Sequence, residues 1–180
     1  MSEYLSFEEF QKNNPLYKYS AYADGRVQIL RNLSREILEE LDKAFPENHI
    51  NFPKQPVTVT AHLGKAEELS WLWVLGAYEV VRTMHEAKEC FSDRAYKSIA
   101  ELKSELSQVR MPMAKMEERK VKGIPKTSIN STGSPAGIDV AKRDLLVGAP
   151  YDPKSLRKLL EHFYAFVSQL DGSDILKSFG

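Results

Sequence analysis

An apolar segment of helical character lies in the middle of the chain. Residues 67–90 read EELSWLWVLGAYEVVRTMHEAKEC, and the interval from Leu69 to Tyr78 contains both tryptophans and no charged side chain. On a helix these apolar side chains would point to almost every side, which is typical of a helix packed against neighbours all round. The pattern therefore predicts a central helix over residues 61–90 that forms the middle of the core.

A second long helix is predicted over residues 93–118. Its apolar side chains recur at alternating spacings of four and three, which is an a/d seam: Ala95, Ile99, Leu102, Leu106, Val109, Met113 and Met116. Because only a few residues join it to the central helix, the two should form an antiparallel hairpin. Pro112 removes one helical hydrogen bond, but the seam keeps its phase beyond it, so we expect a kink and continued helix.

Shorter helices are predicted on both sides of this hairpin. Residues 34–45 carry apolar side chains on one face, and Pro46 ends the pattern. Asp152-Pro153 has the form of a capped helix start, which predicts a helix over residues 153–170. Ser6 and Glu9 have the spacing of a capping box, which predicts a short helix that stops before Pro15.

Two segments favour β structure. Asp24-Gly25 predicts a turn, after which Val27 and Ile29 alternate with polar side chains as in a short strand. Ile138 and Val140, followed by residues 145–147, have the pattern of a small hairpin. Together these segments would make a minor sheet beside the helices.

The remaining segments are predicted to be irregular. Between residues 47 and 60 the prolines favour an extended passage in which Val57 and Val59 form a brief strand, and Thr60 is a plausible cap for the central helix. Residues 120–135 are rich in Gly, Ser, Thr and Lys and predict a long loop. The tail after residue 172 is expected to be loosely held.

Composition is that of an ordinary globular protein. The 180 residues are 42% hydrophobic and 28% charged, and their 25 basic and 25 acidic side chains cancel, so no net field attracts nucleic acid or an anionic membrane. The single cysteine, Cys90, fits a reducing compartment. The N-terminus is acidic where a signal peptide is basic, and the uncharged run of the central helix is shorter than the roughly 20 residues that span a bilayer. We therefore expect a single domain over residues 1–180, mainly α with a minor β element, in the cytoplasm of a bacterium.

Charged side chains gather on the second half of the central helix. Glu79 with Arg82, Arg82 with Glu86, and His85 with Glu89 are spaced so that each pair can meet along the helix surface. One interpretation is a site in which His85 acts as an acid or base and Arg82 holds an anion. The other, which the spacing favours, is a solvated or interface surface stabilised by ion pairs.

Two further binding candidates lie on the second long helix. Arg110 and Lys115 lie on either side of Pro112, and helix kinks sometimes mark functional sites. The alternative is a kink that only lets the helix curve around the core. The 120–135 loop contains residue types that hold phosphates but lacks the spacing of a phosphate-binding loop. No cysteine pair, dinucleotide fingerprint or calcium loop occurs, so neither a cofactor nor a metal ion is predicted.

The last predicted helix carries an arginine and a histidine separated by four residues, Arg157-Lys-Leu-Leu-Glu-His162. This segment resembles the motif of the HEPN superfamily, helical-bundle proteins many of which cleave RNA as dimers. The resemblance implies that Arg157 holds a phosphate and that His162 manages protons. Five residues along a regular helix turn the two side chains well apart, so a shared site would need a second chain or a ligand between them.

Two functional hypotheses follow. The central helix is apolar on more sides than three amphipathic neighbours cover, which predicts a homodimer that buries part of its tryptophan-bearing face. The protein would then be a helical interaction or regulatory module. The alternative is an RNA-cleaving enzyme of the HEPN type that uses Arg157 and His162, with RNA as its partner.

Overall fold

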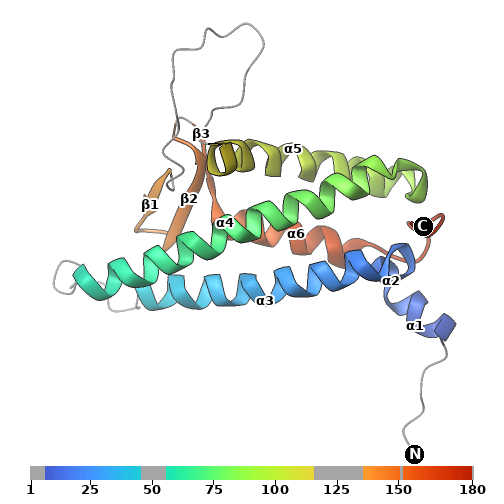
Figure 1. Ribbon diagram of the computed structural model, residues 1–180, viewed down its shortest axis with the longest axis horizontal. Helices are drawn as coiled ribbons and strands as arrows, with labels where there is room; N and C mark the ends of the chain where they lie inside the picture. Colours follow the sequence, from blue (N-terminus) through green and yellow to red (C-terminus); the bar gives the residue numbers. More distant parts are fainter. Residues whose placement is uncertain (1–6, 46–55, 116–135, 151, 180) are drawn as a thin grey trace, which may run out of the picture.

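The computed structural model describes residues 7–45, 56–115, 136–150 and 152–179. These residues form six α-helices, one 3₁₀ turn and a three-stranded antiparallel sheet (Figure 1). The elements are, in chain order, α1 (Phe7–Asn13), α2 (Pro15–Tyr19), α3 (Ala21–Ala44), α4 (Pro56–Glu86), η2 (Lys88–Cys90), α5 (Asp93–Lys115), β1 (Gly137–Asp139), β2 (Asp144–Ala149), β3 (Asp152–Ser155) and α6 (Leu156–Gln169). The predicted class, a mainly α bundle with a minor β element, is confirmed.

Helix α4 is the central helix, as predicted. It runs antiparallel to α3 on one side and to α5 on the other, and α6 lies behind α4 along the length of the bundle (Figure 1). Trp73 is fully buried, and its ring meets Phe163 of α6 edge-on with 5.3 Å between ring centroids. Trp71 is instead 40% exposed, and its indole N–H donates to the carbonyl of Met113 on α5 at 3.0 Å. The predicted α4–α5 hairpin is therefore confirmed, whereas the expectation that α4 is covered on all sides is not.

The region predicted as a turn and strand is helical instead. Ile29 is 61% exposed while Val27 is 1% exposed, and α3 buries a stripe of helical period that consists of Val27, Leu30, Ser34, Ile37 and Leu41. Ser20 caps the helix, because its hydroxyl accepts a backbone N–H of the first turn at 3.4 Å. The burial of that stripe outweighs the roughly 1 kcal/mol that Gly25 costs inside a helix.

Pro56 and Pro112 have different positions in their helices. Pro56 is the first residue of α4, where a missing backbone N–H costs nothing, so the predicted strand at Val57 and Val59 and the cap at Thr60 were wrong. Pro112 lies inside α5, which continues to its last described residue, so the prediction of helix beyond this proline is confirmed. The predicted loop at 120–135 lies outside the described residues.

The sheet has the strand order β1-β2-β3 and packs against α5 and α6. Ile138 pairs with Leu145, which confirms the predicted hairpin, although Val140 lies in the turn after β1. Leu145 and Val147 of the central strand are almost fully buried. The expected participation of residues 27–29 was wrong, because they belong to α3.

The start of the last helix was predicted three residues too early. Residues 152–155 form β3, whose Pro153 is tolerated because β3 is an edge strand. Ser155 then caps α6 by accepting the backbone N–H of Lys158 at 3.1 Å. The buried face of this helix is apolar and consists of Leu156, Leu159, Leu160, Phe163 and Phe166.

The C-terminal tail is packed on the bundle, so the expectation of a loosely held tail was wrong. Ile175 is 2% exposed and forms a β-bridge with Phe91, and the carboxylate of Asp174 is buried beside it. The backbone N–H of Phe179 donates to the carbonyl of Tyr19 at 2.7 Å. These contacts bring the end of the tail to the junction of α2, α3 and α4.

Candidate functional site

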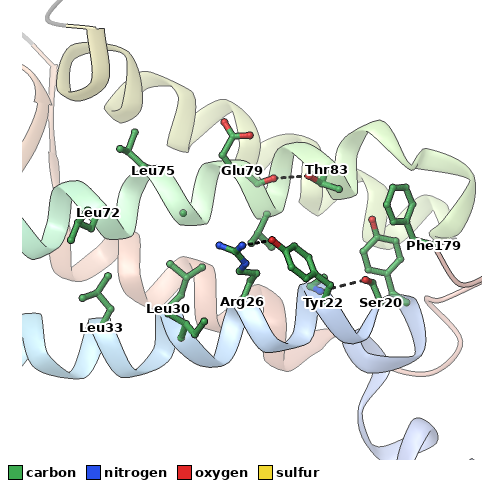
Figure 2. A pocket seen from close by; sticks show the side chains of 15 residues that line it. Ser20, Tyr22, Arg26, Leu30, Leu33, Leu72, Leu75, Glu79, Thr83 and Phe179 are labelled. Carbon is green, nitrogen blue, oxygen red and sulfur yellow. Dashed lines mark hydrogen bonds between the residues drawn. The ribbon is translucent and has the colours of Figure 1, made fainter.

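A groove with a volume of about 720 Å³ lies between α3 and α4 (Figure 2). Phe179 lies at one end of it, and Leu33 and Leu72 lie at the other. Most of its lining is apolar, and the lining residues are Tyr19, Ser20, Tyr22, Ala23, Arg26, Ile29, Leu30, Leu33, Leu72, Leu75, Gly76, Glu79, Val80, Thr83 and Phe179. A concave apolar site with a few polar groups is the usual form of a binding site.

Two stripes of side chains with the same spacing form the walls of this groove. On α3 the stripe is Tyr22, Arg26, Ile29 and Leu33, and on α4 it is Leu72, Gly76, Glu79 and Thr83. Spacings of four, three and four are those of an a/d seam, the arrangement by which a helix packs on another helix. Each of these two helices therefore turns one face to the groove, and that face is mainly apolar on α3 and of mixed character on α4.

Gly76 allows the two helices to approach closely beneath the groove. A Cβ atom at this position would lie 3.0 Å from Cδ2 of Leu30 on α3. That distance is shorter than a normal carbon–carbon contact, so any larger residue would push Leu30 or the helices aside. The close packing of α3 and α4 at Gly76 and Leu30 forms the floor of the groove and makes the groove shallow there. The groove is open on the side opposite this floor.

The rim of the groove exposes large apolar side chains. Tyr22 is 70% exposed, Ile29 61%, Leu72 50% and Phe179 48%. Scattered exposed apolar side chains are normal on a protein surface, but a contiguous group marks a site of interaction. These four come from three separate segments of the chain and meet at one groove, so they form such a group.

The two charged residues of the groove differ in their partners. Arg26 lies over the ring of Tyr22, with 4.7 Å from its Cζ to the ring centroid, and donates to the Tyr22 hydroxyl. Among the described residues no carboxylate forms an ion pair with Arg26. Glu79 pairs instead with Arg82 at 2.8 Å and lies 4.0 Å from Arg110. The groove therefore presents one positive charge whose carboxylate partner is not supplied by the described residues.

Three of the five predicted binding residues, Glu79, Arg82 and Arg110, lie together, and Glu79 among them lines the groove. Glu79, Arg82 and Glu86 meet along α4 as the spacing predicted, and the hydrogen bonds that Arg82 donates to Glu79 and then to Glu86 raise the pKa of Arg82. Arg110 of α5 joins them and lies over the ring of Tyr78, with 4.7 Å from its Cζ to the ring centroid. The side chain of Lys115, the remaining candidate on α5, is outside the described part of the structure.

His85 has partners other than the one predicted. Its Nε2 lies 3.3 Å from the Tyr96 hydroxyl, and its Nδ1 lies 3.2 Å from the Lys103 ammonium group. Glu89, the predicted partner, belongs to the 3₁₀ turn η2 and instead lies 3.5 Å from Lys177. The break in the helix after Glu86 explains the difference, because it ends the helical spacing on which the prediction depended.

Arg157 and His162 interact with different parts of the molecule. Arg157 pairs with Asp42 at 2.7 Å and donates to the carbonyl of Arg143 at 2.9 Å. His162 lies 3.3 Å from Glu105 of α5 and is 57% exposed. The described residues do not bring the two side chains together, so a shared site would need a second chain or a ligand, and RNA cleavage stays a prediction.

Two further findings concern the described residues only. Within 7–45, 56–115, 136–150 and 152–179, no group of His, Cys, Asp and Glu side chains is arranged to hold a metal ion. In the same residues no helix has the length and apolar character needed to cross a membrane.

Most of the groove was missed by the sequence analysis, which found only Glu79. Tyr22, Arg26 and Ile29 lie in the segment that was predicted as a turn and strand, and Phe179 lies in the tail that was expected to be loose. One signal was available: the helical period of Ile37 and Leu41 continues backwards to Leu30 and Val27. That period would have placed Tyr22 and Ile29 on the outer side of a helix.

No protein-family model matches the chain, and comparison with curated proteins and with solved structures gives no match either. The groove and its surroundings are therefore the features of the chain that indicate a function.

Proposed function

We propose that the protein is a helical interaction module that acts as a homodimer, with the groove between α3 and α4 as the contact surface. The observation that carries the proposal is the pair of outward a/d-spaced stripes whose apolar rim, at Tyr22, Ile29 and Leu72, is half or more exposed. An exposed apolar surface along two helices is stabilised when another helix packs against it. The cytoplasmic, bacterial setting expected from the sequence is part of the same proposal.

A second copy of the chain is the occupant that the groove fits. Its walls are two antiparallel helices that carry the same four-three-four spacing. A two-fold axis across the groove would lay the α3–α4 pair of one chain on that of its partner, as in the isologous contacts of most homodimers. The pairing would cover Ile29 and Leu72 in both copies at once.

The mass of the protein in solution tests this proposal. Static light scattering on the full chain at micromolar concentration should give twice the chain mass of 20.5 kDa. Ile29→Glu and Leu72→Glu should each give the mass of one chain, because a charge would be buried without a partner in the contact. Both side chains are exposed in the single chain, so the helical circular dichroism signal should not change.

Ile138→Glu is the matched control. Ile138 is a similarly exposed apolar residue, at 45%, but it lies on β1 away from the groove. This variant should remain dimeric. A wild-type chain that stays monomeric at tens of micromolar would contradict the proposal, as would a dimer that only Ile138→Glu dissociates.

A further inference from the structure

The positive charge of the groove lies beside a long apolar surface. Figure 2 shows Arg26 and Tyr22 pointing into the space between α3 and α4, with Leu30, Leu33 and Leu72 extending from them toward one end. The distance along α3 from Arg26 to Leu33 is about 10 Å at the helical rise of 1.5 Å per residue. One end of a ligand in this space would therefore meet a cation and a hydroxyl, and the rest would meet only hydrocarbon.

The charged side chains of the groove favour a ligand with a negative charge. The carboxylate of Glu79 is already held by Arg82, with Arg110 nearby, whereas Arg26 has only the hydroxyl and ring of Tyr22 among the described residues. A guanidinium group binds a carboxylate through two parallel hydrogen bonds. The volume of about 720 Å³ is within the range of small-molecule sites.

We propose that the groove binds a single-chain amphiphile with an anionic carboxylate head, of the fatty-acid type. Arg26 and the Tyr22 hydroxyl hold the head group, and the alkyl chain lies along Leu30, Leu33 and Leu72. Such a ligand would replace water on exposed apolar surface and would give Arg26 a carboxylate partner, which the described residues do not supply.

This ligand would occupy the same space as a second copy of the chain. Binding of the ligand should therefore shift a dimer toward the monomer. The size of the shift depends on how much more tightly the ligand binds the monomer, whose groove is open, than the dimer. This consequence, unlike the binding itself, rests on the proposed function.

Calorimetric titration with dodecanoate, dodecanol and dodecylammonium, each below its micelle concentration, tests the inference on the wild-type chain. The three probes share one alkyl chain and differ in head-group charge, so dodecanoate should bind most tightly and dodecylammonium least. Arg26→Gln should weaken dodecanoate binding roughly tenfold, which is the scale of one hydrogen-bonded charge pair. Arg31→Gln is the control, because Arg31 lies on the same helix but does not line the groove, and it should bind dodecanoate as the wild type does.

Equal affinity for the three probes would overturn the inference, because it would indicate apolar adsorption without recognition of the head group. Equal affinity of the wild type and Arg26→Gln for dodecanoate would also overturn it. The two proposals fail separately: Arg26-dependent binding by a monomeric chain contradicts only the dimer, and a dimer that dissociates on Leu72→Glu but does not bind dodecanoate contradicts only the ligand.

Discussion

At the residue scale, two glycines occupy opposite kinds of environment. Gly148 of β2 has a φ of +96°, and a Cβ there would lie 3.7 Å from Val109 of α5. Gly25 is inside α3, and a Cβ there would meet no atom within 4 Å. We expect Gly148→Ala to lower the free energy of unfolding by about 1–3 kcal/mol, because residues with a side chain are strained at this φ. Gly25→Ala should raise it by up to about 1 kcal/mol, because alanine favours the helix.

Urea denaturation of the two variants beside the wild type measures both effects. The midpoint should fall for Gly148→Ala and rise for Gly25→Ala with similar slopes. A Gly148→Ala variant as stable as the wild type would show that β2 can adopt another backbone conformation at this position. Neither environment can be predicted from the sequence, because a glycine residue does not itself indicate its φ angle or its neighbours. The positive φ of Gly148 and its approach to α5 appear only in the folded structure.

At the element scale, one buried carboxylate ties α3 to α4. Glu40 of α3 is 4% exposed and lies 2.6 Å from Nδ1 of His62 and 3.4 Å from Nζ of Lys65, both on α4, and 3.0 Å from Nζ of Lys43. The hydrogen bond from His62, followed by that from Lys43, lowers the pKa of Glu40 from 4.5 to about 2. The ionised form of Glu40 is therefore the one that stabilises the contact between the two helices.

This pKa predicts how stability falls in acid. Because the folded pKa of Glu40 is below the unfolded value, the unfolded chain takes up the proton first as the pH falls. The contribution of Glu40 should be complete above about pH 4.5 and should be lost as the pH falls toward 2. Urea midpoints for wild type and Glu40→Gln should therefore differ at pH 7 and converge between pH 4 and about 2.

Glu36→Gln is the control for this prediction. Glu36 also pairs with Lys65, at 2.8 Å, but the side chain of Glu36 is 47% exposed. Loss of this ion pair in Glu36→Gln should therefore change the urea midpoint little at any pH. A constant difference between wild type and Glu40→Gln from pH 7 to about 2 would contradict the assignment of the ionised carboxylate as the stabilising form.

The elements with a strong helical period were predictable, and those decided by partners were not. The seam of α5 and the apolar run of α4 specify helices without knowledge of the rest of the chain, and both were predicted. Residues 152–155 form β3 only because β2 lies beside them, and local capping signals favoured a helix there. Val27 and Ile29 alternate in the sequence as in a strand, and only the longer helical period that continues to Ile37 and Leu41 distinguishes the buried Val27 from the exposed Ile29.

At the scale of the whole molecule, the candidate site is a product of long-range packing. The groove joins residues from Tyr19 to Phe179, which include both helices of the α3–α4 pair and the end of the tail. Glu79 could be predicted because its ion-pair partner Arg82 lies three residues along the same helix. The apolar rim could not, because the meeting of Ile29, Leu72 and Phe179 at one groove depends on how α3, α4 and the tail pack together.

The C-terminal tail packs against α2 and the turn between α4 and α5, and Asp174 is one of the residues that hold it there. Its carboxylate is 2% exposed and accepts from the Ser92 hydroxyl at 2.6 Å and from Nε of Arg94 at 3.2 Å. Asp174→Ala would leave these donors without their partner and should lower the free energy of unfolding by about 1–3 kcal/mol. The substitution should also increase hydrogen exchange at the backbone amide of Phe179, because its bond to Tyr19 depends on the docked tail.

Asp171→Ala separates this anchoring from a simple loss of charge. Asp171 also pairs with Arg94, at 2.9 Å, but its side chain is 57% exposed, and exposed ion pairs contribute between 0 and about 1 kcal/mol. Asp171→Ala should therefore leave exchange at Phe179 nearly unchanged. Equal destabilisation by the two substitutions would mean that the charge of the pair with Arg94, and not the buried position of Asp174, holds the tail against the helices.

Since Phe179 forms one end of the groove, release of the tail in Asp174→Ala should lengthen the exposed apolar surface there and weaken any contact that depends on the shape of the groove.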